Sequence, residues 1–115
     1  MEITKNEALI GEYKKRAAEI VSRLTLEEEV SQTVNSAKAV ERLGIKAYNW
    51  WNEGLHGVAR AGVATVFPQA ITLAAAFDEE LIEKIADAVS TEARAKFNMQ
   101  QDFNDTDIYK GLTYW

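Results

Sequence analysis

Residues 48–60 carry the sequence YNWWNEGLHGVAR, the most informative stretch of this 115-residue chain. Positions 48–56 hold two tryptophans, a tyrosine, two asparagines, a carboxylate and the only histidine. Aromatic faces suit the C–H surfaces of sugar rings, while amide and carboxylate groups hydrogen-bond to hydroxyls. A carboxylate such as that of Glu53 can accept two adjacent hydroxyl protons, and charge-assisted bonds of this kind are strong. The stretch therefore favours a carbohydrate-binding loop.

The same residues also have structural interpretations. Trp50 and Trp51 could be core or interface residues, and a lone histidine such as His56 is commonly a structural hydrogen-bond donor. Glu53 and His56 stand three apart and could face each other on a helical turn, as in half of a di-iron site, but no second half-site follows. The acidic residues within 102–107 lack the glycine and closing glutamate of an EF-hand loop. We therefore expect no metal site.

Length and composition point to a single small domain. The chain has a mass of 12.9 kDa and 47% apolar residues, enough for a core. Its formal charge of -5 and the lack of a Lys/Arg cluster argue against nucleic acid as a partner. The absence of cysteine excludes disulfides, thiolate zinc sites and thiol nucleophiles. We expect chemistry based on carboxylates, amides, hydroxyls or aromatic rings, with no cofactor.

Hydropathy gives no sign of a membrane segment. Residues 1–15 are rich in charge without an apolar signal-peptide core, and no apolar run reaches bilayer length. We expect a soluble, cytoplasmic protein without a membrane partner.

The first part of the chain predicts two helices. Apolar residues recur at spacings of three and four over 6–24, so they form one stripe of an amphipathic helix that packs on another element. Thr25 and Glu28 form a capping-box pattern that opens a second, shorter helix, ending near Asn35 and Ser36.

The rest of the chain predicts loops, two helices and a strand. Periodicity is lost over 37–67, which indicates loops and short strands. Pro68 stands at the first turn of a tightly packed helix over 69–76. Asp78 caps a long helix to about Phe97, in which Glu92 is an odd polar residue in the apolar row and Arg94 and Lys96 are surface charges. We expect a polar surface loop over 98–107 and entry into a strand over 108–115.

The end of the chain indicates truncation. Residues 111–115, GLTYW, are β-prone and stop without a turn or a partner strand, which would leave an apolar edge exposed. No repeat or linker divides the sequence, so we treat residues 1–115 as one incomplete domain.

Several ordered blocks closely resemble the start of glycoside hydrolase family 3, in its β-xylosidase and β-glucosidase branch. The central blocks are 50–58 (WWNEGLHGV), 59–62 (ARAG) and 65–70 (TVFPQA). Further matches lie upstream and downstream, so that the resemblance covers nearly the whole chain. They are at residues 16–18, 24–28, 77–78, 92–95 and 109–113.

The resemblance implies an α/β fold: the N-terminal fragment of a (β/α)8 TIM-like barrel, mostly helical with a few short strands. It also implies a retaining exo-glycosidase that removes terminal β-linked sugars. By this resemblance Glu53 binds the hydroxyls of the terminal sugar, Trp51 helps to shape the same pocket, and His56 and Gly57 keep the loop in its bend. The family usually has aspartate at the position of Glu53, and glutamate is typical of its xylosidase-like branch.

The family's nucleophile, an aspartate on a late barrel strand, and its acid/base both lie beyond this chain, so no catalytic residue is assigned. We expect a parent enzyme that hydrolyses β-xylosides or β-glucosides, with a β-linked oligosaccharide or glycoside as its substrate. We expect the 115-residue chain itself to be inactive. Because its apolar stripes lack most of a sheet, we also expect it to self-associate. Two alternatives stay open: a small helical interaction module with a Trp-rich loop, and a non-catalytic sugar-binding module.

Overall fold

The computed structural model describes residues 2–114 and, within the first helix, side chains from residue 6 onward. The chain is mostly helical with one two-stranded sheet, which confirms that part of the fold prediction. In chain order, the elements are α1 (Glu2–Val21), α2 (Leu26–Ser31), β1 (Ser36–Ala37), the 3₁₀ helix η1 (Glu41–Leu43), β2 (Tyr48–Asn49), α3 (Ala70–Ala74) and α4 (Glu79–Gln101).

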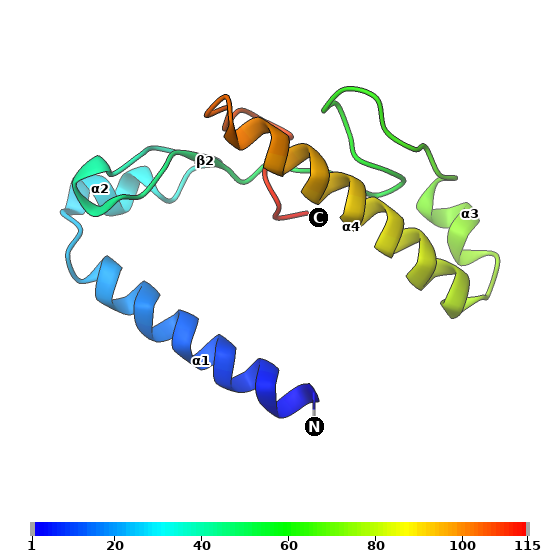
Figure 1. Cartoon of the computed structure of the whole chain (residues 1–115), viewed down its shortest axis with the longest axis horizontal. Coiled ribbons are helices and arrows are strands. Elements are labelled where there is room, and N and C mark those ends of the chain that lie inside the picture. Colours follow the sequence, from blue (N-terminus) through cyan, green and yellow to red (C-terminus); the bar gives the residue numbers. More distant parts are fainter. Residues whose placement is uncertain (1, 115) are drawn as a thin grey trace.

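Helix α1 forms where the apolar periodicity predicts a helix, although it begins and ends three to four residues earlier than the predicted 6–24. The prediction that it packs on another element is wrong. Leu9, Ile10, Tyr13 and Val21 of its stripe are each 43% to 53% exposed. Figure 1 shows α1 projecting from the corner at α2 with no element alongside it. The helix is amphipathic in sequence while its apolar face stays open to solvent.

The capping box at the start of α2 is confirmed. The Glu28 amide donates to Thr25 Oγ1 at 3.3 Å, and the Thr25 amide donates to Glu28 Oε2 at 2.8 Å. The helix ends earlier than predicted, at Ser31. Gln32 caps it by donating its backbone N–H to the carbonyls of Glu29 and Val30. Ser36, which was predicted to lie at the end of the helix, is instead the first residue of β1.

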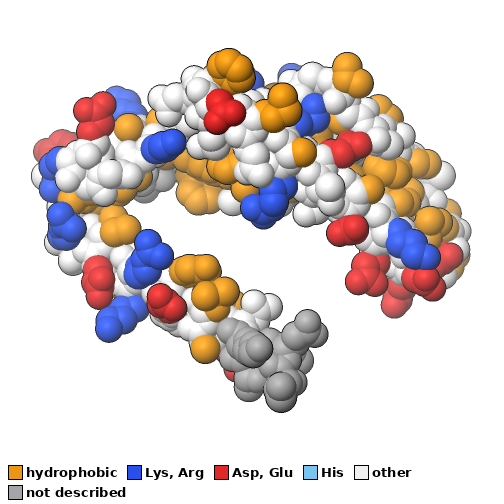
Figure 2. Space-filling view, viewed as in Figure 1, with side chains coloured by type: hydrophobic (Ala, Val, Ile, Leu, Met, Phe, Trp, Pro, Cys, Tyr) orange, Lys and Arg blue, Asp and Glu red, His pale blue; other side chains and the backbone are white. Residues whose placement is uncertain are grey.

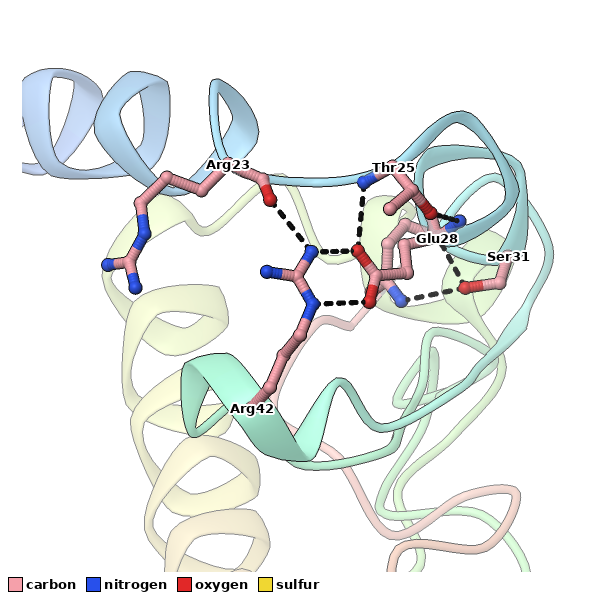
Figure 3. Close-up of polar contacts among 6 residues, drawn as sticks. Arg23, Thr25, Glu28, Ser31 and Arg42 are labelled. Atoms are coloured by element: carbon pink, nitrogen blue, oxygen red, sulfur yellow. Dashed lines mark hydrogen bonds and ion pairs between the residues drawn. The ribbon is translucent and has the colours of Figure 1, made fainter.

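Arg42 fixes the corner between α1 and α2 (Figure 3). Its Nε donates to Glu28 Oε1 at 2.8 Å and its Nη2 to the Arg23 carbonyl at 2.7 Å, and it also forms an ion pair with Glu28 Oε2. The Arg23 carbonyl lies just beyond the end of α1. A single guanidinium from η1 therefore ties that end of α1 to the start of α2.

Residues 37–67 form loops and short strands, as the sequence predicts. Strands β1 and β2 are antiparallel, with Ser36 opposite Asn49 and Ala37 opposite Tyr48. Between them, a bridge between Val40 and Ile45 closes the turn that holds η1. This small sheet places the end of β2 directly before residues 50–58.

The third and fourth helices differ from the sequence prediction in several of their boundaries. Gln69 is the N-cap of α3, so Pro68 lies one residue before the cap, outside the first turn. Helix α3 is not tightly packed, since Ile71 is 82% exposed. Asp78 caps α4 as predicted, accepting from the Leu81 amide at 3.0 Å. Helix α4 continues one turn past Phe97 to Gln101, and so takes in the start of the predicted 98–107 loop.

The core is small and takes residues from β1 and the turn after it, from the loop after β2, from α4 and from the C-terminal segment. Its buried apolar residues are Ala37, Val40, Val58, Ala93 and Tyr109. The predicted strand over 108–115 reduces to one parallel bridge between Asn52 and Tyr114, and Trp115 lies outside the described residues. Within residues 2–114, no helix is long and apolar enough to cross a bilayer.

The Arg42 contacts predict an acid-shifted Glu28. Its hydrogen bond from Arg42, assisted by the one from Thr25, lowers the pKa of Glu28 from 4.5 to about 2. Because this pKa is depressed in the folded chain, the contribution of Glu28 to stability is complete above pH 4.5 and is lost as the pH falls toward 2. NMR titration of the Glu28 carboxyl carbon should give this value, and Arg42→Ala should return it toward 4.5. An unshifted carboxyl in the native chain would contradict the contact.

Candidate functional site

Asn52 anchors the loop that follows β2. It is fully buried, its Oδ1 accepts from the Gly111 amide at 2.7 Å, and its Nδ2 donates to the Asn49 carbonyl at 3.0 Å and Thr113 Oγ1 at 3.3 Å. A Cβ at Gly111 would lie 2.7 Å from Asn52 Nδ2 and 2.6 Å from the Tyr48 hydroxyl, so the approach needs glycine. The Asn52 side chain therefore joins the loop to the C-terminal segment.

Two neighbours of Asn52 strengthen this connection. The Tyr48 hydroxyl accepts from the amides of Leu112 at 2.7 Å and Thr113 at 3.0 Å, and the Trp51 carbonyl accepts from the Tyr109 amide at 3.0 Å. Residues 48–52 are thus held at one side by residues 109–114.

His56 and Gly57 contact a second segment on the other side of the loop. His56 Nδ1 lies 3.2 Å from the Phe67 carbonyl, and the Phe67 amide donates to the His56 carbonyl at 2.8 Å. Gly57 has φ +120°, and a Cβ there would lie 2.2 Å from the Thr65 carbonyl oxygen. The backbone of residues 56–57 therefore runs against residues 65–67 at a distance only glycine allows.

In sequence, Glu53 lies between residues 48–52, which contact the C-terminal segment, and residues 56–57, which contact residues 65–67. Its Oε1 accepts from the indole Nε1 of Trp51 at 3.0 Å, and its backbone carbonyl accepts from the Ala59 amide at 3.0 Å. Glu53 and His56 do not share a helical turn, because residues 50–58 are not helical. The side chain of Glu53 is half-buried and that of Trp51 is 40% exposed.

An open cavity of about 440 Å³ adjoins this carboxylate. It is lined by Glu53, by residues 55–60 and by residues 62–66. A carboxylate has lone pairs for several donors, so Glu53 can hold the Trp51 indole and still accept from hydroxyls of a ligand. Such a site can bind and orient a polyhydroxylated molecule. The structure shows no cluster of three or more metal-ligating side chains among residues 2–114.

Known proteins provide an independent comparison. The chain is 44% identical over 110 residues to β-D-xylosidase 1 of Arabidopsis thaliana, covering 87% of this chain and 13% of that protein. It is 46% identical over 111 residues to an exo-1,4-β-xylosidase of Emericella nidulans, covering 87% and 14%. It is 42% identical over 104 residues to a xylan 1,4-β-xylosidase of Xylanibacter ruminicola, covering 89% and 12%. The chain belongs to the β-xylosidase family.

The family relationship confirms the resemblance carried by residues 50–70. No family model matches the chain. This member of the β-xylosidase family spans only 12% to 14% of the length of the three relatives above.

Two residues that support the loop of this β-xylosidase-family chain were missed or misassigned from sequence. Glu92, the odd polar residue in the row of α4, accepts from the Thr65 amide at 3.0 Å and from the Thr65 hydroxyl. These hydrogen bonds lower the pKa of Glu92. Lys96 is not a simple surface charge, because its Nζ donates to the carbonyls of Ala61 at 2.7 Å and Val63 at 2.6 Å. Two side chains of α4 therefore hold residues 61–65, most of which line the cavity.

The close approach at Gly57 predicts a large effect of one added methyl group. Gly57→Ala places a Cβ in the left-handed region against the Thr65 carbonyl, and we expect a loss of at least about 2 kcal/mol of unfolding free energy in urea. The matched control is Gly11→Ala on α1, where nothing lies within 4 Å of the added Cβ. We expect that change to be neutral or to stabilise the helix by up to about 1 kcal/mol. Equal effects of the two substitutions would contradict the predicted strain at Gly57.

Proposed function

We propose that this chain forms one wall of the sugar-binding pocket of a retaining, exo-acting β-glycosidase that hydrolyses terminal β-xylosyl or β-glucosyl residues without a cofactor. In this proposal residues 1–115 are the N-terminal part of a barrel domain of the (β/α)8 type. The β-xylosidase names of the three relatives support the reaction class. They do not favour the alternative of a protein-interaction module.

The observation that carries the proposal is the hydrogen bond between Glu53 and Trp51 beside an open cavity. The bond at 3.0 Å fixes the carboxylate next to an indole ring, which combines a hydroxyl acceptor with an apolar face. In this assignment Glu53 binds the hydroxyls of the terminal sugar and Trp51 shapes the pocket. His56 and Gly57 hold the loop against residues 65–67.

Bond cleavage requires groups that this chain does not supply. Retaining hydrolysis uses two carboxyl groups about 5 to 5.5 Å apart, one as nucleophile and the other as acid and then base. By the family resemblance, both belong to later barrel segments, so Glu53 is a binding residue. We propose xylose as the favoured sugar, because the longer reach of glutamate than aspartate suits a smaller ring.

The first test is activity of the 115-residue chain by itself. We expect no release of the aryl group from an aryl β-xyloside above the buffer rate, because no nucleophile is present. Turnover that disappears in the Glu53→Ala variant would contradict this assignment.

The binding role of Glu53 can be tested in a chimera. Residues 1–115 replace the matching segment of the Xylanibacter ruminicola relative, and kcat/KM is measured on an aryl β-xyloside. Loss of charge-assisted hydrogen bonds worth about 3 kcal/mol predicts a fall in kcat/KM of about 10²-fold for Glu53→Ala. The control is Glu27→Ala on the exposed face of α2, which should leave kcat/KM unchanged. Equal activity of the two folded variants would refute the role of Glu53.

A further inference from the structure

Two side chains on one face of α4 hold a neighbouring loop. Glu92 and Lys96 are four residues apart, so they project from the same side of the helix. Glu92 accepts from the amide and from the hydroxyl of Thr65. Lys96 donates to the carbonyls of Ala61 and Val63. Together, the two side chains use three backbone groups and one hydroxyl of the loop.

Residues 61–66, the 61–66 loop, gain little from apolar burial. Val63 is 96% exposed and Val66 is 78% exposed. The loop rises beside α4 in Figure 1, and Figure 2 shows hydrophobic side chains at its outer edge. Among residues 2–114, no hydrogen bond joins the backbone of this loop to the backbone of another segment. The place of the 61–66 loop therefore depends on its polar contacts with α4.

Thr65 contacts α4 on one side and the loop that carries Glu53 on the other. Its amide and hydroxyl donate to Glu92. Its carbonyl oxygen would lie 2.2 Å from a Cβ at Gly57, so the two backbones are in close contact there. Thr65 is therefore held between the Glu92 carboxylate and the backbone of residue 57.

The connection from Gly57 to Glu53 is short. The Ala59 amide donates to the Glu53 carbonyl at 3.0 Å and so closes residues 53–59 into a tight loop. The Glu53 carboxylate and residues 62–66 line the same cavity of about 440 Å³. A shift of Thr65 would therefore change both the wall formed by residues 62–66 and the loop that carries Glu53.

We propose that Glu92 is a positioning residue, which holds Thr65 and through Thr65 sets the position of the Glu53 carboxylate in the cavity. A carboxylate suits this task, because Oε2 accepts from the Thr65 amide while Oε1 accepts from the hydroxyl of the same residue. This role also accounts for the polar residue that interrupts the apolar row of α4. The effect on the position of Glu53 is a property of this chain, whereas the effect on sugar binding rests on the function proposed above.

NMR of the 115-residue chain tests the effect on position. The Trp51 indole proton reports on Glu53, because Nε1 donates to Glu53 Oε1 at 3.0 Å. Glu92→Ala should raise the exchange rate of the Thr65 amide proton at least about tenfold and move the indole resonance toward its position in Glu53→Ala. Glu92→Gln keeps an acceptor for the amide and offers a donor to the hydroxyl, so both signals should stay close to native.

Glu83→Ala is the matched control, since Glu83 is an exposed glutamate earlier on α4. It should leave both signals unchanged. Thr65→Val removes the hydroxyl contact alone, and it should move the indole resonance in the same direction as Glu92→Ala by a smaller amount. Circular dichroism checks that each variant keeps its helices. A Glu92 that only stabilised the fold would lower the melting temperature of Glu92→Ala and leave the indole resonance in place, and this result would overturn the proposal.

A double-mutant cycle in the Xylanibacter ruminicola chimera tests the effect on the sugar. Glu92→Ala should lower kcat/KM about tenfold when Glu53 is present. In the Glu53→Ala background it should change kcat/KM less than about twofold, because Glu92 acts by way of Glu53. Equal losses in the two backgrounds would contradict this role.

The two experiments separate the two proposals. If Glu53→Ala leaves kcat/KM of the chimera unchanged, the proposed function fails, and the indole resonance still decides whether Glu92 positions Glu53. If the indole resonance stays in place in Glu92→Ala, the positioning role fails even where Glu53 binds the sugar.

Discussion

The buried amide of Asn52 joins two segments that lie 59 residues apart in sequence. It accepts from Gly111 and donates to Asn49 and Thr113, so both ends of the amide are used inside the small core. A buried amide left without partners costs about 1 to 3 kcal/mol, which makes this arrangement strongly preferred over alternatives that break it. The position of the loop after β2 therefore depends on the C-terminal segment, and the position of the C-terminal segment depends on the loop.

The position of the candidate site follows from this constraint. Glu53 comes directly after Asn52, and it is half-buried whereas Asn52 is fully buried. Trp51 shares the side of Glu53, and its indole donates to the carboxylate. Glu92 and Lys96 of α4 hold residues 61–65 by hydrogen bonds to Thr65, Ala61 and Val63. The chain thus builds one wall of an open cavity, with a carboxylate that is held in place by an indole.

Local signals were readable from the sequence. Thr25 with Glu28 and Asp78 before α4 are caps that depend on neighbouring residues alone, and both form as predicted. The aromatic and carboxylate composition of 48–56 predicts a sugar-binding loop, and Glu53 of this loop lines the open cavity. The binding role itself stays a prediction. Features that depend on distant partners were not readable. Nothing near Asn52 indicates that Gly111 and Thr113 will complete its hydrogen bonds, and nothing near Glu92 or Lys96 indicates residues 61–65. The periodicity of α1 likewise predicts an apolar face but not what covers it.

The exchange rate of the Gly111 amide proton measures the central contact most directly. This amide donates to the fully buried Asn52 Oδ1, so its exchange with deuterium should be strongly slowed in the native chain. In Asn52→Ala the same proton should exchange at close to the rate of an unstructured peptide, while amides in the middle of α4 keep their protection. A Gly111 proton that exchanges equally fast in both chains would contradict the account.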